Sequence, residues 1–373
     1  MAKLGEVCKV SASTKMIDKS KAWLLNLDMV EQQTGRVVEY NFVGEDGLNG
    51  SIMQFDTENV LYSKLRPNLN KVVLPERNGF CTSELLPLRP DARKLDRSYL
   101  AVFLRSDGFV NWAVSKTAGA KMPRLGTKDL LNTNIPLPEI KEQKAIAEKF
   151  KKSEELISLR KQQLFKLDEL VKARFVKMFD AISPKKCASK IGECAEVLGG
   201  YAFKSDCFSN QGVPVVRIGN INDGRIDIDY NTCYAEEFWN KNPRFQARKY
   251  DILMAMSGAT TGKVGIYKSD ERLLINQRVA CIRARDDESA IFLFACLQLP
   301  WMYNLVQEAS AGCAQPNISG KQIETMPVPK PETSKVHQFA AFVECVDQQK
   351  QTIQQSLEKL ELMKKALMQE YFG

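Results

Sequence analysis

The chain has 373 residues, of which 44% are hydrophobic and 26% charged, and its formal net charge is +8. These values are typical of a globular protein with two or three cores, and no apolar run reaches the roughly 18 residues that a membrane-spanning helix needs. The start, MAKLGEVCKV, lacks the apolar core of an export signal. The positive charge permits a polyanionic partner without requiring one.

The ten cysteines include no C-x-x-C pair, and the two nearest, Cys187 and Cys194, are too far apart for the close ligand pairs of a structural zinc site. We therefore expect reduced thiols, no metal and a cytoplasmic location. The only histidine, His337, falls in a predicted long helix. There it is expected to be a surface or seam residue rather than half of a catalytic pair.

The first predicted part, 1–138, is globular and mixes strands with loops. Its segment NVLYSKLRPNLNKVVL (59–74) brings together basic and amide side chains, Lys64, Arg66, Asn70 and Lys71. A second segment, GAKMPRLGTKDLLNTNIPLPE (119–139), adds Lys121 and Arg124.

The next part, 139–180, is predicted to be one long helix because it has no Gly or Pro from Glu139 to Phe179. Apolar residues recur at steps of three, four or seven, which is typical of a coiled-coil seam. That seam comprises Ile146, Phe150, Ile157, Leu164, Leu167 and Val171.

The second globular part, 181–331, carries several local signals. VPVVRIGNINDGRIDID (213–229) predicts a hairpin around Asn-Asp-Gly, and RLLINQRVACIRAR (272–285) alternates like a strand. SAIFLFACLQLPWMYNLVQEAS (289–310) predicts one short buried helix. Both globular parts are assigned to the α+β class.

The last part, 332–373, repeats the helical pattern, with a seam of Phe339, Val343, Val346, Ile353, Leu357 and Leu360. Such helices need an apolar partner, so either they pair with each other or each packs onto its own domain. The chain order favours an antiparallel pair, with a domain at each end and a pseudo-twofold axis between them. Forty residues give a rod of about 60 Å, which would act as a ruler.

The chain is an internal repeat. Residues 119–139 align with GCAQPNISGKQIETMPVPKPE (312–332) at an offset of 193, so that Pro123 matches Pro316. The same offset continues through the helices without a gap. Segment 59–74 aligns with DILMAMSGATTGKVGI (251–266) at an offset of 192, which pairs Lys71-Val72 with Lys263-Val264.

Two segments resemble catalytic motifs, but each lacks a feature that its motif requires. SGATTGKV (257–264) resembles a phosphate-binding loop, but only three residues separate its glycines, and Val264 replaces the hydroxyl residue that holds magnesium. NPRF (242–245) resembles the (D/N)-P-P-(Y/F) motif of DNA amino-methyltransferases, yet no glycine-rich cofactor loop accompanies it. A polar turn is the simpler interpretation.

What remains is binding chemistry. Arg and Lys suit guanine edges and phosphates, Asn and Gln suit adenine, and the backbone N–H groups at Gly258 and Gly262 could form an anion nest. The candidate DNA-binding residues are Lys64, Arg66, Asn70, Lys71, Lys121, Arg124, Arg217, Asn220, Ser257, Thr260, Thr261, Lys263, Asn276, Gln277, Arg278, Gln315 and Asn317.

Over essentially its whole length the chain resembles the specificity (S) subunits of type I restriction–modification enzymes. The resemblance rests on Ile191-Gly192-Glu193, PVVRIGNINDGRI, DILMAMSGATTGKVGIY with LLINQRVA, and QPNISGKQIETMPVPKP. In the first copy it rests on NVLYSKLRPNLNKVVL and PLPEIKEQKAI. SKVHQFA departs from the usual start of the second helix.

The resemblance implies a non-catalytic subunit in which 1–138 and 181–331 are target recognition domains. Each would read one half of a split, asymmetric double-stranded DNA target, with the spacer set by the helices. It implies docking of two methyltransferase subunits and leaves open whether two restriction subunits join. S-adenosylmethionine, ATP and magnesium would belong to those partners.

Three alternatives stay open. One is the recognition subunit of a related two-subunit restriction–modification system, and the others are a stand-alone DNA methyltransferase and a coiled-coil protein that binds only proteins.

Overall fold

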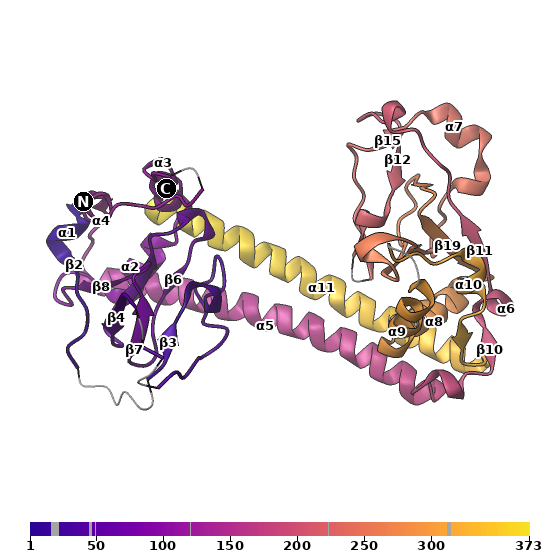
Figure 1. Cartoon of the computed structure of the whole chain (residues 1–373), viewed down its shortest axis with the longest axis horizontal. Helices are drawn as coiled ribbons and strands as arrows, with labels where there is room; N and C mark the ends of the chain where they lie inside the picture. Colours follow the sequence, from indigo (N-terminus) through magenta and orange to yellow (C-terminus); the bar gives the residue numbers. More distant parts are fainter. Residues whose placement is uncertain (16–21, 45–46, 49, 120, 223, 312–314) are drawn as a thin grey trace. The chain divides into compact units, whose positions relative to one another are not determined.

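The computed structural model describes residues 1–15, 22–44, 47–48, 50–119, 121–222, 224–311 and 315–373. The chain forms two compact units: unit 1 contains Met1–Lys161 and Gln355–Gly373, and unit 2 contains Gln162–Gln354. Each unit therefore combines one globular part with a stretch of both long helices. Both ends of the chain lie in unit 1 (Figure 1).

The two long helices are α5, Ile140–Phe179, and α11, Thr333–Phe372 (Figure 1). Each begins and ends one residue inside the predicted range. The only histidine, His337, lies on α11, where its Nδ1 is 2.8 Å from Glu288 Oε1 and its side chain is exposed. It is thus a surface residue of a helix, as expected.

The globular part of unit 1 is built from short elements in the following order: β1 (Ala2–Lys3), α1 (Leu4–Val7), β2 (Cys8–Val10), β3 (Leu24–Leu25), η2 (Leu27–Met29), β4 (Ile52–Phe55), β5 (Val60–Ser63), η3 (Pro67–Leu69), β6 (Val72–Val73), β7 (Gly79–Thr82), β8 (Leu85–Pro90), α2 (Arg97–Leu104), α3 (Asp107–Ser115), α4 (Thr127–Asn132) and β9 (Asn134–Ile135).

Unit 2 repeats much of this order after α5: η4 (Pro184–Lys186), β10 (Ser189–Lys190), α6 (Ile191–Cys194), β11 (Ala195–Gly199), η5 (Ser205–Cys207), β12 (Val213–Val216), η6 (Ile218–Asn220), β13 (Ile221–Asn222), β14 (Arg225–Ile226), β15 (Cys233–Tyr234), α7 (Glu236–Lys241), η7 (Pro243–Phe245), β16 (Ile252–Ala255), η8 (Gly258–Thr260), β17 (Val264–Ile266), β18 (Leu274–Ile275), β19 (Val279–Ala284), α8 (Asp287–Leu297), α9 (Pro300–Ser310), α10 (Gly320–Glu324) and β20 (Pro327–Val328).

The two units share the topology of their four-stranded sheet. The four-stranded sheet has the order β2-β8-β5-β6 in unit 1 and β11-β19-β16-β17 in unit 2, and all of its pairs are antiparallel. Val60 pairs with Leu88 in unit 1, and the equivalent pair in unit 2 is Ile252 with Ile282. A two-stranded sheet, β1-β9 or β10-β20, joins the start of each globular part to its end. The repeat seen in the sequence is therefore a repeat of fold.

A three-stranded sheet is where the units diverge. The parallel pair β3-β7 of unit 1 corresponds to β12-β18 of unit 2, but β4 joins β7 whereas β15 joins β12. The predicted Asn-Asp-Gly hairpin is present between β13 and β14, although its centre, Asp223, lies outside the described residues. Val213–Val216 does not belong to this hairpin and instead pairs with β15 and β18.

The predicted single helix over 289–310 is wrong, because the structure has two helices, α8 and α9, bent by 74°. Pro300 stands in the first turn of α9, where its missing N–H costs nothing. In the described part of the chain, no single helix is long and apolar enough to cross a membrane, and this bent pair reaches that length and hydropathy only in combination. The buried face of both helices contributes to the main core of unit 2.

Both long helices supply side chains to both cores. In unit 1, Phe150 of α5 is 1% exposed, and Phe372 of α11 packs with Tyr99 and Phe103 of α2. In unit 2, Phe339 of α11 is fully buried against Phe175 of α5. Large aromatic side chains contribute several kcal/mol each when buried, so the helix ends are integral to both units.

Near the ends that belong to unit 1, the helices also contact each other directly. In unit 1, Lys364 Nζ of α11 is 2.8 Å from Glu154 Oε1 of α5, and Lys149 Nζ donates to Tyr371 Oη at 2.9 Å. The residue numbers rise along α5 as they fall along α11, so the helices are antiparallel within this unit.

Every residue of the predicted seam is buried or half-buried. Its buried members are Ile146, Phe150, Phe339, Val343, Val346 and Leu357, and its half-buried members are Ile157, Leu164, Leu167, Val171, Ile353 and Leu360. The helix ends therefore pack on the globular cores, and ion pairs join the two helices within each unit, Lys161 with Glu361 in unit 1 and Lys350 with Asp168 in unit 2. That the helices form a continuous coiled coil stays a prediction.

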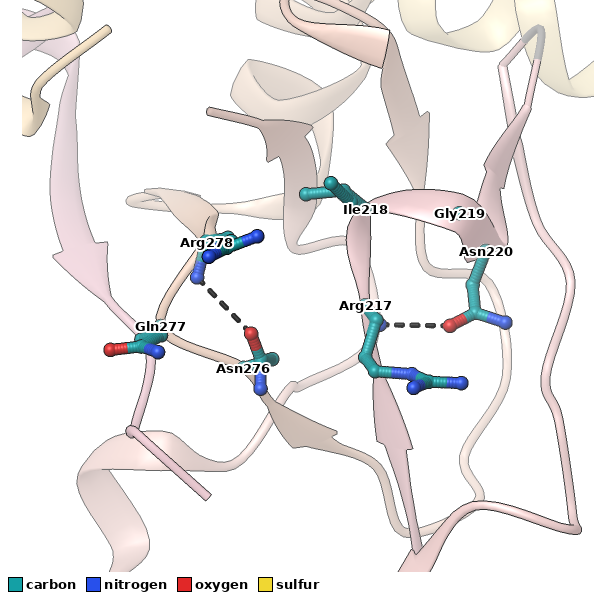
Figure 2. Close-up of a pocket in the computed structure, with 7 residues that line it drawn as sticks. All are labelled: Arg217, Ile218, Gly219, Asn220, Asn276, Gln277 and Arg278. Atoms are coloured by element: carbon teal, nitrogen blue, oxygen red, sulfur yellow. Dashed lines mark hydrogen bonds between the residues drawn. The ribbon is translucent and has the colours of Figure 1, made fainter. Parts of the chain in front are cut away.

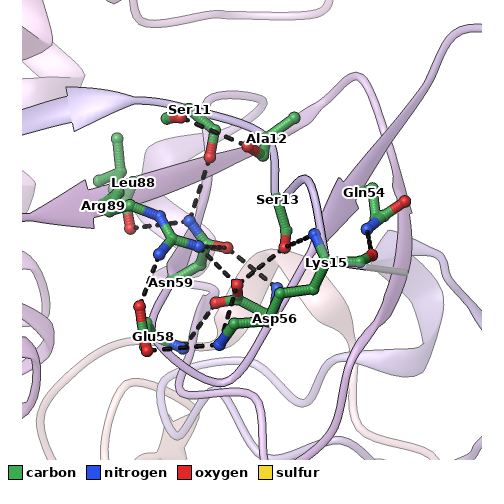
Figure 3. Close-up of polar contacts among 10 residues, drawn as sticks. All are labelled: Ser11, Ala12, Ser13, Lys15, Gln54, Asp56, Glu58, Asn59, Leu88 and Arg89. Atoms are coloured by element: carbon green, nitrogen blue, oxygen red, sulfur yellow. Dashed lines mark hydrogen bonds and ion pairs between the residues drawn. The ribbon is translucent and has the colours of Figure 1, made fainter. Parts of the chain in front are cut away.

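A buried ion pair fastens each four-stranded sheet. In unit 1, Arg89 Nη2 of β8 is 2.6 Å from Asp56 Oδ2, whose side chain is 1% exposed (Figure 3). Ser13 Oγ and the backbone N–H of Glu58 donate to the same carboxylate at 2.8 and 2.9 Å. Burial alone would raise the pKa of Asp56, but these donors outweigh it and lower the pKa to about 2.

In unit 2 the equivalent arginine, Arg283 of β19, pairs with Asp251 through two bonds of 2.9 and 2.6 Å. The carboxylate thus comes from a different place in the loop before the central strand. The arginine position is kept in both units, whereas its partner is not.

Candidate nucleic-acid interface

One loop, which joins a central strand of the four-stranded sheet to its edge strand, has the same backbone frame in both units. The backbone N–H of Ser63 donates to the carbonyl of Lys71 at 3.1 Å, and that of Ala255 donates to the carbonyl of Lys263 at 2.9 Å. We call these the β5–β6 loop and the β16–β17 loop. Lys71 and Lys263 are therefore structurally equivalent, as the sequence repeat predicted.

Each loop is fastened to a second segment through a proline carbonyl. The N–H of Arg66 donates to Pro123 at 2.8 Å, and the N–H of Gly258 donates to Pro316 at 3.1 Å. This bond brings the two polar segments found in the sequence of each copy side by side. Spatial grouping of the candidate residues thus follows from backbone hydrogen bonds.

The two glycines of SGATTGKV do not form the predicted anion nest. The N–H of Gly258 is used by Pro316, that of Gly262 by Ala255, and that of Lys263 by Thr260. Gly258 and Gly262 have φ of +78° and +84°, so glycine serves the left-handed turn rather than a phosphate.

The first copy makes the same turn without glycine. Arg66 and Asn70, equivalent to Gly258 and Gly262, have φ of +48° and +50°. Asparagine tolerates this region, whereas a left-handed arginine costs about 1 kcal/mol. Arg66 is exposed, so its side chain can reach a ligand at the surface.

Unit 2 contains a cavity of about 530 Å³ beside this loop (Figure 2). One wall is the turn between β18 and β19, and the other is η6 with the residue before it. Five of the predicted residues line it, together with Ile218 and Gly219: Arg217, Asn220, Asn276, Gln277 and Arg278. The sequence had placed these residues in two separate segments, and the structure brings them together.

The polar groups of this cavity are only partly occupied. Asn276 Oδ1 accepts the N–H of Arg278, and Asn220 Oδ1 accepts the N–H of Arg217, as Figure 2 shows. Within the described part of the chain, the side chains of Gln277 and Arg278 have no hydrogen-bond partner and are exposed. The cavity therefore presents donors and acceptors that remain free for a ligand.

An aromatic cluster supports one side of the cavity. Tyr201, which is 37% exposed, makes edge-on or tilted ring contacts with Phe203, Phe238 and Phe245 at centroid distances of 4.7–5.2 Å. The backbone N–H of Gln277 donates to the Tyr201 carbonyl at 2.8 Å. The NPRF segment is thus a turn whose Phe245 packs in this cluster, which agrees with the structural interpretation of that motif.

In unit 1 the same loop backbone carries different polar side chains. Arg124 lies beside Glu84, with Nε–Oε1, Nε–Oε2 and Nη2–Oε1 distances of 3.1, 3.2 and 3.0 Å. The N–H of Lys64 donates to the Glu84 carbonyl at 3.0 Å. Glu84 was not among the predicted residues, because a single acidic residue before a strand carries no sequence signal of its role.

Several predicted residues have structural partners. Asn70 and Thr261 are buried; Asn70 Nδ2 donates to the carbonyl of Arg105, and Thr261 Oγ1 donates to that of Gly258. We therefore remove both from the candidate set. Lys71 Nζ donates to the Leu27 carbonyl at 2.5 Å, and burial lowers its pKa.

The remaining candidates differ in exposure. The hydroxyl oxygens of Ser257 and Thr260 are buried and have no hydrogen-bond partner among the described residues. Half-buried residues are Lys64, Asn220, Lys263 and Asn276; exposed ones are Arg66, Lys121, Arg124, Arg217, Gln277, Arg278, Gln315 and Asn317. In each unit the exposed residues come from neighbouring loops at one end of the sheets.

Comparison with known proteins identifies the family. The model of the type I restriction modification DNA specificity domain matches twice, at residues 1–169 and 185–362. The type I restriction enzyme MjaVIII specificity subunit of Methanocaldococcus jannaschii is 26% identical over 315 residues, covering 78% of this chain and 73% of that protein. The EcoDI specificity subunit of Escherichia coli is 30% identical over 117 residues, covering 31% and 26%.

Solved structures agree in fold. The S subunit of a type I restriction–modification system from M. genitalium has a TM-score of 0.61 at 15% identity, covering 100% of this chain and 95% of that one. A chain from a study of complex assembly and conformational transition of the type I system has a TM-score of 0.60 at 19% identity, covering 100% and 96%. The chain belongs to the family of type I restriction–modification DNA specificity subunits, which recognise DNA and are not catalytic.

Proposed function

We propose that each unit reads one half of a bipartite, asymmetric double-stranded DNA target through the loops described above. The observation that carries this proposal is the shared loop frame with different side chains. Equivalent positions hold Arg66 and Gly258, or Arg124 and Asn317. A common frame would place both units on DNA in one pose, while different side chains would select different bases.

The helices α5 and α11 would form an antiparallel coiled coil that fixes the spacer between the half-sites. Their 40 residues correspond to about 60 Å of helix, and the globular parts overlap its ends. Half-sites would then be one to one and a half DNA turns apart, given about 34–36 Å per turn. The contacts of Glu154 with Lys364 and of Lys149 with Tyr371, which make the helices antiparallel within unit 1, support this arrangement.

The same helices would dock two methyltransferase subunits, and two restriction subunits could complete the assembly. Support comes from large apolar side chains that face solvent: in unit 1, Leu159 and Leu362 are 54% and 68% exposed, and in unit 2, Phe165 is 66% exposed. Exposed apolar groups of this size on a helix are typical of protein interaction sites. Methyl transfer and ATP-driven steps would belong to the partners.

The runner-up is the recognition subunit of a related two-subunit restriction–modification system, which would use the same frame. A stand-alone methyltransferase is disfavoured by the structural role of NPRF in the aromatic cluster. Genes next to this one would separate the two systems.

Methylome sequencing of cells that express this chain with its methyltransferase partner tests the proposal directly. The expected result is one split, asymmetric motif methylated in both halves. Methylation without a split motif, or methyl transfer by the purified chain alone, would contradict it.

A further inference from the structure

Two equivalent positions flank the loop frame in both units. In unit 1 they hold Glu84 and Arg124, and in unit 2 they hold Arg278 and Asn317. The N–H of Lys64 donates to the Glu84 carbonyl at 3.0 Å, as that of Met256 does to the Arg278 carbonyl at 2.9 Å. Arg124 pairs in a β-bridge with Leu65, as Asn317 does with Ser257.

The side chains at these positions are chemically unlike. Unit 2 presents an arginine and an amide with no partner among the described residues, and both are exposed. Unit 1 presents a carboxylate that already holds an arginine. A structural ion pair kept for stability would not need to vary between units whose backbone frame is the same, and an exposed pair contributes little stability in any case.

The geometry of the unit 1 pair leaves part of the guanidinium free. Glu84 takes the Nε–H and one N–H of Nη2 of Arg124, which is the side edge of the planar group. The end edge, formed by Nη1 and the second N–H of Nη2, keeps two parallel donors without a partner in the described chain. Two parallel donors match the O6 and N7 acceptors of guanine in the major groove.

We propose that Arg124, oriented by Glu84, reads a guanine in the half-site of unit 1, and that Arg278 and Asn317 occupy the base-reading positions of unit 2. This inference rests on the proposed DNA-binding function. Glu84 acts as a positioning residue: it removes the rotational freedom of the arginine and sets the plane of its end edge. The 42% exposure of the Arg124 side chain leaves that edge open to a ligand.

Conservative variants separate base reading from mere charge. Arg124→Lys keeps the positive charge but loses the two parallel N–H donors, so the affinity for non-specific DNA and its salt dependence should change little. Preference for guanine over other bases at one position should fall roughly tenfold to a hundredfold. Glu84→Gln should relax the same position by a smaller factor, because the amide still accepts one hydrogen bond.

Arg93→Lys is the matched control. Arg93 pairs with Asp91 at 3.3 Å just beyond the far end of β8, and Glu84 precedes the near end of the same strand, about 20 Å away. This variant should leave the motif unchanged. Thermal unfolding of all three variants checks that they are folded.

The assay is selection of a random duplex pool by the full-length chain bound to its methyltransferase partner, followed by sequencing. A wild-type complex that selects no motif would overturn the proposed function itself. A wild-type motif that Arg124→Lys leaves intact would overturn only the inference, and would place Arg124 on a phosphate. Loss of preference in both half-sites at once would also overturn it, because a unit 1 residue should affect one half alone.

Discussion

The buried carboxylate of Asp56 should make unit 1 sensitive to acid. Its folded-state pKa of about 2 lies below the ordinary 3.8, and the difference corresponds to about 2 kcal/mol of folding free energy. Because the pKa is lowered on folding, this stabilisation is fully present above about pH 4 and is lost as pH falls toward 2. By pH 3 about half of it should be gone.

Asp56→Asn tests that reasoning. At pH 7 the variant should lose about 2–3 kcal/mol, since Glu58, 2.6 Å away, would be the carboxylate left to Arg89, whose side chain is 29% exposed. At pH 3 the gap to the wild type should be smaller, because protonated aspartate and asparagine are alike. Asp270→Asn, which breaks an exposed pair with Lys249, should have no measurable effect at either pH.

The measurement is urea unfolding at pH 7 and pH 3, combined with hydrogen exchange of peptides from residues 50–90. Exchange localises the effect to the sheet of unit 1, which matters because the chain has two compact units. A free-energy gap between variant and wild type that is equal at both pH values would refute the argument, since the charge on Asp56 would then not be its source.

Three further outcomes are expected. Lys263→Ala should weaken DNA binding and lower the salt slope by about one, and an unchanged slope would place Lys263 off the phosphates. Inserting seven residues into both α5 and α11 should lengthen the methylated motif's spacer by about 3 base pairs, and an unaltered spacer would refute the ruler. Gly262→Ala should destabilise unit 2 by about 1–3 kcal/mol in thermal unfolding, because the φ of Gly262 is +84° and a Cβ there would lie 2.9 Å from Val306 Cγ1. Gly199→Ala is the control, because a Cβ at Gly199 would have no heavy atom within 4 Å.

The long helices and the repeat could be predicted because their signals are long and regular. A run of 40 residues without Gly or Pro, with a heptad seam, admits few other structures. The separate match of segment 59–74 with 251–266, at an offset of 192, also predicted that Lys71 and Lys263 are equivalent, and the strand hydrogen bonds confirm it.

The recognition loops were harder, for physical reasons. Strands of two residues, such as β3 and β18, have no periodicity to detect. The equivalence of Glu84 with Arg278 appears only in the strand register, because insertions shift the offset there. The anion nest was predicted from glycines whose N–H groups are in fact used by the turn, and composition alone cannot show which donors are already taken.

The left-handed positions of the two loops also limit how this family can vary here. The turn is held by backbone N–H groups, so its shape tolerates Gly, Asn or even Arg, as positions 66, 70, 258 and 262 show. β-Branched residues are excluded there by steric clash in that region of φ and ψ. Mutational drift at positions 66 and 258 can therefore exchange one unbranched side chain for another and alter the loop's chemistry while its backbone stays the same, whereas at position 262 Val306 sets a further steric limit.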